Sequence, residues 1–499
     1  MEEPIDPVIR SEPVATPVVA PVRSSAAPAS GLPGRIRAFE AGLAVAALLA
    51  LAAFAVSLAS GPFDYAFGPL RVGVRYPSAP FGLFLGFVAA AAVTRMRAAG
   101  HEWVVRVPSL ALTLTVIASV TIPEMHKIGL AVTYVVALLF AIEGIVRGAY
   151  PFRRTPLDLP IAIFAATQLA AALLAKEQSR CLGEFFSSTI PPLVLLYSIH
   201  EHGRWRPAAV KAVIATVALS VVILLVVGYR RYFTSGEPFF IANLGWYTRT
   251  GRFLNLTLPL VAGLAIWRGP ALVRLGALVL ALAASVALVL TQSRGAWAGA
   301  VASFVFLGFF LDRRLLIVLA GALLLAIAAA PQRLVDHARS MFDFANFGES
   351  STVSPLKYRP AAWRFAVESI ADKPLIGHGL GASGFREGFV EAVSPPPNHG
   401  IANAHNVFLE VAYESGLVGL AAFLALVGSM FALGFRSRGA PRDREPGRFP
   451  LATVSLAALV GVLVHGLVSH VTHDPLSGLF FAQGALVLLD RPTAEAPAA

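Results

Sequence analysis

Long apolar runs, joined by short connections that contain arginine, make up most of the chain. An α-helix needs about 20 apolar residues, with a range of roughly 17–25, to cross the hydrocarbon core of a bilayer. The pattern therefore predicts an all-α, polytopic integral membrane helical bundle of about 12–14 transmembrane helices, a range because three runs, 79–97, 253–267 and 475–490, are short. The predicted spans are 39–60, 79–97, 104–122, 128–147, 157–175, 182–199, 208–229, 253–267, 273–291, 295–311, 314–330, 405–434, 451–469 and 475–490.

Composition agrees with this interpretation, because 56% of the residues are hydrophobic and only 14% are charged. A soluble chain of this length would carry far more charge, so most of this chain must be solvated by lipid. Cys181 is the single cysteine. It excludes an intramolecular disulfide and a cysteine-based zinc or iron–sulfur site.

The distribution of arginine predicts how the bundle is oriented. Lys and Arg are retained in short cytoplasmic loops, and a cytoplasmic N-terminus keeps nearly every arginine-rich connection inside. The terminal tails, 1–38 and 491–499, are then both cytoplasmic, and the proline- and alanine-rich N-terminal tail is predicted to be disordered. The arginines kept inside are Arg95, Arg97, Arg147, Arg153, Arg154, Arg204, Arg206, Arg268, Arg274, Arg313, Arg314, Arg436, Arg438, Arg442, Arg444 and Arg448.

The segment 331–404 is large enough to fold by itself, and the orientation places it outside, in the periplasm of a Gram-negative cell. It separates an N-terminal transmembrane bundle, 39–330, from the C-terminal transmembrane helices, 405–490. Its stretch "YRPAAWRFAVESI" has the i, i+3, i+4, i+7 spacing of an amphipathic helix, which either packs on the bundle or grips substrate. The apolar positions of that stripe are Trp363, Ala366, Val367 and Ile370.

The same segment contains "GHGLGASG", in which Gly379, Gly381 and Gly384 spell GxGxxG. A dinucleotide-binding fingerprint must follow a strand within a βαβ unit, and no such unit is predicted here. The glycines are therefore interpreted as a turn after Pro374.

The orientation leaves several cations on the outer side, and Arg180, Arg252 and Arg294 lie at or beside the ends of apolar runs. One such arginine alone would be explained by snorkelling to lipid headgroups. Three or more at one end of a bundle favour convergence on a cavity, and the planar guanidinium fork binds phosphate oxygens through two parallel hydrogen bonds. The pattern predicts a site for a lipid diphosphate at headgroup depth. Further outer-side cations expected to contact substrate are Lys176, Arg249 and Arg359.

His405 lies where the periplasmic segment meets the next span, at the depth of these arginines. Its unperturbed pKa, about 6.5, lets it accept a proton near neutrality; the alternative is a capping or hydrogen-bonded loop histidine. Asn406 either caps the helix or holds an acceptor hydroxyl. Glu410 and Glu414 are one turn apart. Their carboxylates either interact with the partial positive charge at the N-terminal end of the helix or orient a histidine or an arginine. A second polar cluster at the outer end of the penultimate span consists of His470, His473 and Asp474.

A divalent metal is the rival use of such groups. The outer segments contain no Asp-x-Asp, and His399 and His405 lack the i, i+4 register of a helical metal pair. We therefore expect neither metal nor cofactor, with arginine stabilising the charge on the leaving phosphate.

Four segments in order carry a family resemblance: "GRFLNLTLPL", "LTQSRGAWAGA", "YRPAAWRFAVESIADKPLIGHGLGASGF" and "HNVFLEVAYESGLVGL". Together they resemble the O-antigen ligase and polymerase superfamily. The resemblance implies an inverting, metal-independent glycosyltransferase of the bacterial inner membrane, which moves a glycan from undecaprenyl diphosphate to lipid A–core oligosaccharide on the periplasmic face. By position, Arg252 and Arg294 match the family's arginines and His405 its essential histidine, whereas Arg180 rests on the charge argument. The expected partners are these two substrates and membrane lipids, with no nucleic acid.

Alternatives stay open within this resemblance. An O-antigen polymerase and a protein O-oligosaccharyltransferase share the chemistry, and a ligase is favoured because the large loop comes late in the chain. A flippase for lipid-linked glycans is the alternative of a different class, because transport needs polar groups and broken helices near the midplane. Pro191 and Pro192, which are expected to break one helix, are its best support.

Overall fold

A computed structural model describes the chain over 34–60, 63–67, 70–74, 78–121, 126–236, 239–316, 359–392, 403–438, 449–470 and 476–490. The described part is helical apart from one antiparallel hairpin, β1 (Phe63–Phe67) and β2 (Leu70–Val74), which was not predicted. Every predicted span except 314–330 overlaps a described helix, and of that span only 314–316 lie within the described residues. Of the predicted tails and periplasmic segment, 1–33, 331–358, 393–402 and 491–499 lie outside them, so these domain boundaries stay predictions.

The helices follow the apolar runs closely. Their bounds are α1 Gly34–Ser60, α2 Ser78–Ala98, α3 Trp103–Ser119, α4 His126–Arg147, α5 Asp158–Leu174, α6 Gln178–Glu184, α7 Ile190–Trp205, α8 Pro207–Ser235, α9 Tyr247–Ile266, α10 Ala271–Leu290, α11 Arg294–Phe310, α14 Arg359–Asp372, α15 Ala382–Ala392, α16 Val407–Arg438, α17 Leu451–Gly466 and α18 Ser477–Leu489. A π-helical turn, η2 (Phe185–Thr189), joins α6 to α7, and a short 3₁₀ turn, η3 (Ala242–Leu244), precedes α9.

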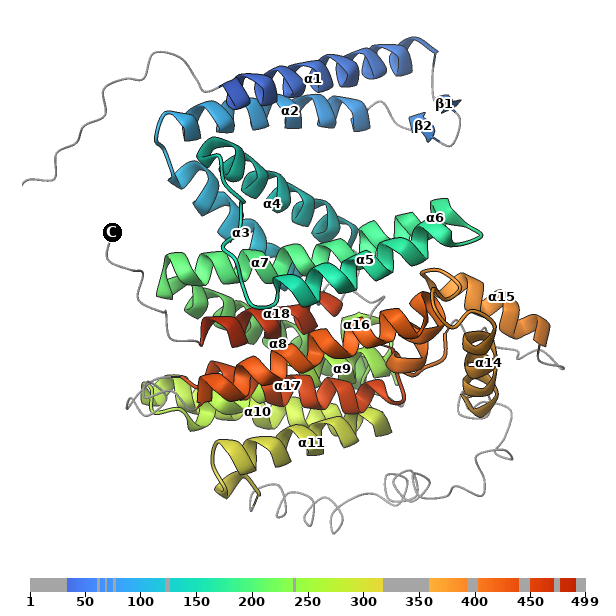
Figure 1. Cartoon of the computed structure of the whole chain (residues 1–499). Coiled ribbons are helices and arrows are strands. Elements are labelled where there is room, and N and C mark those ends of the chain that lie inside the picture. The colour runs from blue at the N-terminus through green and yellow to red at the C-terminus, as the bar shows by residue number, and fades with distance from the viewer. Residues whose placement is uncertain are drawn as a thin grey trace, which may run out of the picture.

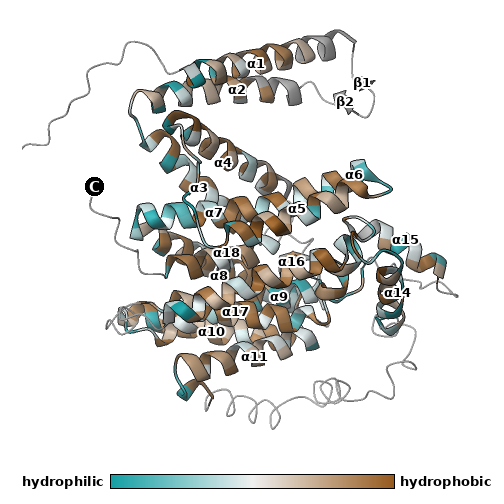
Figure 2. Ribbon diagram, viewed as in Figure 1, coloured by the Kyte–Doolittle hydropathy of each residue, from teal (hydrophilic) through white to brown (hydrophobic). Residues whose placement is uncertain are grey.

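Six helical stretches among the described residues are long and apolar enough to cross a bilayer, so the protein is a multi-pass membrane protein. They are Gly34–Ala53, Ile128–Arg147, Gln178–Trp205, Pro207–Ser235, Ala271–Leu290 and Val407–Ser437. Shorter apolar helices lie beside them, and apolar residues cover the helices along most of their length (Figure 2). Whether both termini are cytoplasmic stays a prediction.

The centre of the bundle is formed by α9, α17 and α18, which are buried along almost their whole length. Many large apolar side chains of α1, α8 and α10 are instead exposed, as expected for surfaces that contact lipid. Figure 1 shows α6, α14 and α15 at one end of the bundle, where α14 runs across the direction of the long helices. That end is the predicted periplasmic side.

Small residues let α11 and α17 pack closely. A Cβ atom at Gly299 would overlap the carbonyl oxygen of Gly461, and Ser303 Oγ donates to the Ala457 carbonyl over 2.8 Å. Close backbone approach through small residues is a common way to join membrane helices. It fixes α11, and with it Arg294 at its first position, against α17.

Helix α16 is broken at Gly416, whose φ of 70° and ψ of −177° are accessible to glycine only. The break frees the Tyr413 and Glu414 carbonyls, which accept from the backbone N–H groups of His378 over 2.8 Å and Gly379 over 3.0 Å. The Leu417 N–H in turn donates to the Pro374 carbonyl over 2.7 Å. The glycine-rich segment is thus a turn that supplies hydrogen-bond partners to the backbone groups freed by the helix break, and the prediction of a turn after Pro374 is confirmed.

We expect Gly416→Ala to destabilise the protein by about 1–3 kcal/mol, because alanine does not adopt this backbone conformation and its Cβ would overlap Leu375. The midpoint of thermal unfolding in detergent measures the loss. Gly428→Ala is the matched control in the same helix, because nothing lies within 4 Å of an added Cβ there. Equal midpoints for the two variants would show that the break does not need glycine.

The amphipathic helix predicted in the periplasmic segment is present as α14, but part of the predicted stripe is wrong. Ala366 and Ile370 are buried against α16, and Trp363 packs beside them, whereas Val367 is 55% exposed. The buried face instead includes Ala362. A small alanine allows α14 to approach α16 closely, and this rotates the face away from the bulkier valine.

Candidate active site

Three arginines come from the first two turns of three different helices. Arg294 begins α11, Arg359 begins α14, and Arg252 lies in the second turn of α9. Arg252 is fully buried, and its Nη2 donates to Ser469 Oγ beyond α17 over 3.1 Å. Arg294 follows a three-residue turn after α10. In that turn Gln292 is left-handed, with φ 52°.

Electrostatic effects show that these arginines share one region with His405. Burial lowers the pKa of Arg359; nearby Tyr247 raises it and nearby Arg294 lowers it. Burial, followed by the charges of Arg359 and Arg252, lowers the pKa of His405 to about 4. The structure therefore brings Arg252, Arg294 and Arg359 together with His405. Within the described residues Arg180, which was predicted to converge with Arg252 and Arg294, is not part of this group.

The loop that carries His405 is fixed at several points. The Trp363 Nε1–H of α14 donates to the Ala404 carbonyl over 2.8 Å, and Asn403 Oδ1 accepts from the His405 N–H over 3.1 Å. His405 itself is left-handed, with φ 49°, which is uncommon for a residue other than glycine. Asn406 Oδ1 accepts from the N–H groups of Phe408 and Leu409 over 3.0 and 3.2 Å, so Asn406 caps α16.

The two predicted glutamates lie within α16 and are both buried. Glu414 Oε1 accepts from the Gly381 N–H over 2.9 Å, so this carboxylate anchors the glycine-rich turn. Glu410 lies one turn nearer His405, and its N–H donates to the Asn406 carbonyl over 2.9 Å.

The other predicted cations lie in different surroundings. Arg180 pairs with Glu177 and lies against Gly384 of α15. Among the described residues, these contacts lie apart from Arg252 and His405. Lys176 is exposed in the connection between α5 and α6, and Arg249 is half-buried in the first turn of α9. His473 and Asp474 lie outside the described residues.

The structure adds polar residues that the sequence analysis did not select. Asn255 Nδ2 lies 3.4 Å from His465 Nδ1, and His465 is only 1% exposed. A Cβ atom at Gly295 would lie 2.8 Å from the His465 ring, so the helix turn after Arg294 packs directly on this histidine. The available signal was Asn255 itself, a polar residue inside an apolar run and close in sequence to Arg252, since polar residues within membrane helices are usually functional.

These groups can together bind an anion and accept a proton. Three guanidinium groups supply positive charge, and the low pKa of His405 keeps its imidazole neutral at pH 7. Within the described residues, no cluster of three or more His, Cys, Asp or Glu side chains is placed to hold a metal ion.

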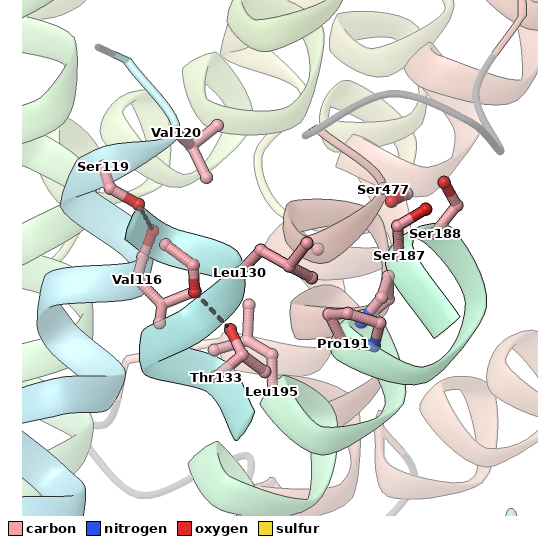
Figure 3. A pocket seen from close by; sticks show the side chains of 13 residues that line it. Val116, Ser119, Val120, Leu130, Thr133, Ser187, Ser188, Pro191, Leu195 and Ser477 are labelled. Atoms are coloured by element: carbon pink, nitrogen blue, oxygen red, sulfur yellow. Dashed lines mark hydrogen bonds between the residues drawn. The ribbon is translucent and has the colours of Figure 1, made fainter. Parts of the chain in front are cut away.

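A separate cavity of about 70 Å³ lies between α3, α4, α7 and α18 (Figure 3). In Figure 3, Ser187, Ser188 and Ser477 lie on one side of it, and Thr133 lies on the other, beyond Leu130. The predicted break at Pro191 and Pro192 is wrong, because Gln178–Trp205 is one continuous helical stretch. The π-helical turn η2 lies just before the two prolines and supplies two of these serines. No arginine or histidine lines this cavity.

Fold and site define a multi-pass membrane protein in which three arginines and a neutral histidine lie together at one end of the bundle. Residues 277–424 match the family described as O-antigen ligase, and the chain carries a domain of this family. The domain is that of a membrane glycosyltransferase of the ligase and polymerase type, which acts on lipid-linked glycans. The match contains Arg294, Arg359 and His405 but not Arg252. No curated protein matches the chain.

Proposed function

We propose that the protein is an O-antigen ligase of the bacterial inner membrane. It transfers a glycan from undecaprenyl diphosphate to lipid A–core oligosaccharide on the periplasmic face, with inversion and without metal. The observation that carries this proposal is the convergence of Arg252, Arg294 and Arg359, from three helices, beside a neutral His405. Both termini are then cytoplasmic, as the arginine-rich connections at the other side require.

The arginines bind the diphosphate of the donor. Guanidinium groups remain charged at every relevant pH and match phosphate oxygens with paired N–H donors. The buried Arg359 Nε has no hydrogen-bond partner among the described residues, so it is available to an incoming oxygen. The same groups stabilise the leaving diphosphate as the glycosidic bond breaks.

His405 is the general base. One of its ring nitrogens takes the proton of an acceptor sugar hydroxyl, and the oxygen attacks the anomeric carbon from the face opposite the diphosphate. The bond between that carbon and the diphosphate oxygen breaks, so the configuration inverts and undecaprenyl diphosphate leaves with the electron pair. Asn406 holds the helix end beside the base, and Glu410 and Glu414 fix that end from within α16.

The remaining candidate residues are assigned to the outer part of the substrates. Lys176, Arg180 and Arg249 lie near helix ends on the predicted periplasmic side, where they contact charged or hydroxylated sugar groups. His473 and Asp474, in the connection between α17 and α18, are proposed for the same role.

The low pKa of His405 predicts a distinctive pH dependence. In the free enzyme the base is already deprotonated above about pH 4, so kcat/KM is expected to stay constant from about pH 5 upward. A bound diphosphate offsets the charges of Arg359 and Arg252, and a nearby negative charge favours the protonated imidazole. The pKa of His405 therefore rises in the complex, and the acid limb of kcat lies at higher pH than that of kcat/KM.

Initial rates of glycan transfer between pH 4 and 8, at saturating and at low donor, measure both profiles. Identical acid limbs near pH 6.5, the usual range of histidine, would contradict the proposed coupling between the base and the arginines.

Transfer of label in proteoliposomes tests the function. Purified protein receives labelled lipid-linked O-antigen together with rough lipopolysaccharide, and label on lipopolysaccharide is the expected result. Longer lipid-linked chains would instead identify a polymerase, and label on a pilin-like protein an O-oligosaccharyltransferase. Movement of the lipid-linked glycan across the bilayer with no covalent product would identify a flippase, for which the π-helical turn η2 before Pro191 and Pro192 is the supporting observation.

A further inference from the structure

We propose that His470, acting through Asn403, is a positioning residue for His405. This inference rests on the proposed function, because it assigns His405 the role of base. It concerns Asn403 and His470, which have no role in the proposed mechanism.

Asn403 connects the two histidines. Its Oδ1 accepts from the backbone N–H of His405 over 3.1 Å, and its Nδ2 lies 3.3 Å from His470 Nδ1. A backbone N–H can only donate, so the amide oxygen must face His405 and the amide nitrogen must face His470. His470 Nδ1 is therefore an acceptor, and the neutral ring carries its proton on Nε2.

The connection acts on a strained residue. His405 has a φ of 49°. This left-handed conformation is unfavourable in free energy for any residue that has a Cβ atom. The bond from its N–H to Asn403 stabilises this conformation, and His470 in turn fixes the rotamer of Asn403. The rings of His405 and His470 lie 6.2 Å apart between centroids and are tilted by 55°, so His470 borders the base without stacking on it.

Ser469, which precedes His470 in the chain, contacts an arginine of the site. Ser469 Oγ accepts from Arg252 Nη2 over 3.1 Å. Two successive residues at the end of α17 thus hold an arginine for the leaving diphosphate and the loop of the base. The segment sets the separation between these two groups, on which the alignment of attack and departure depends.

Matched substitutions at position 470 test the inference in the transfer assay. His470→Phe keeps a ring but removes the acceptor, and kcat is expected to fall about tenfold, as for a lost hydrogen bond, with little change in KM for the donor. His470→Asn retains a side-chain acceptor at the δ position and is expected to recover most of the rate. His101→Asn, at an exposed turn between α2 and α3, is the control for the substitution itself.

A double-mutant cycle separates positioning from a general loss of structure. If His470 acts through Asn403, the double variant Asn403→Ala/His470→Phe is expected to be no slower than the slower single variant. Multiplicative losses, or equal rates for His470→Phe and His470→Asn, would overturn the inference. If wild type transfers and His405→Ala does not, such a result leaves the proposed function standing.

A readout without turnover covers the case in which wild type itself transfers nothing. Nitrogen-15 NMR of histidine-labelled protein distinguishes the two neutral tautomers, and His470→Phe assigns the resonance. The Nε2–H tautomer of His470 is expected in wild type, with an altered signal in Asn403→Ala. A His470 resonance that is unaffected by Asn403→Ala would overturn the inference by itself.

Discussion

Replacing His405 with alanine is expected to slow glycan transfer by about 10²–10⁴-fold, the contribution of a positioned general base. The donor should still bind, because the arginines that hold the diphosphate come from other helices. The loss therefore falls on kcat, and KM for the donor changes little. Transfer of labelled O-antigen to rough lipopolysaccharide by purified protein measures both constants.

His101→Ala is the matched control for this variant, because His101 is exposed in the connection between α2 and α3. It should transfer at the wild-type rate. Near-normal transfer by His405→Ala would rule out His405 as the proposed base.

Arg252→Ala is expected to lower kcat by about 10²–10³-fold, comparable to the loss of one well-placed charged donor at a leaving group. Arg252 is the most deeply buried of the three arginines, and its bond to Ser469 fixes its direction. Arg252→Lys retains a positive charge but loses the planar fork, so it should recover only a small part of the rate.

Arg268→Ala serves as the control, because Arg268 is exposed just beyond the other end of α9. Its variant should bind donor and transfer normally. Equal losses in Arg252→Ala and Arg268→Ala would mean that total charge matters and that the buried position of Arg252 does not.

Helices were predictable because each is encoded locally, by a run of apolar residues long enough to cross a bilayer. Within the run 182–199 the helix continues through Pro191 and Pro192, and the N–H groups that these prolines lack are accommodated by the π-helical turn η2 before them. The hairpin β1–β2 was missed, because two five-residue strands leave no signal at the scale of a membrane span. The exposed Val367 was missed for a different reason, because the packing of α14 on α16 decides which face is buried.

The candidate site was partly predictable. Arg252 and Arg294 were predicted because they are charged residues at the ends of apolar runs on the outer side of the membrane. His405 was predicted because it lies at the same end of the predicted bundle. Packing partners were not predictable in this way: Ser469 and His465 approach Arg252 and Asn255 only because α17 packs between α9 and α11. Sequence placed Arg180 in the same group as Arg252, whereas its described contacts are with Glu177 and α15.

An experimental structure with bound undecaprenyl diphosphate is the most direct test of how this site works. We predict diphosphate oxygens within about 3 Å of the guanidinium groups of Arg252 and Arg294, with the His405 ring facing the terminal phosphate, which carries the glycan in the donor. A diphosphate held elsewhere on the bundle, with these arginines turned toward lipid or protein and His405 remote from it, would contradict the account.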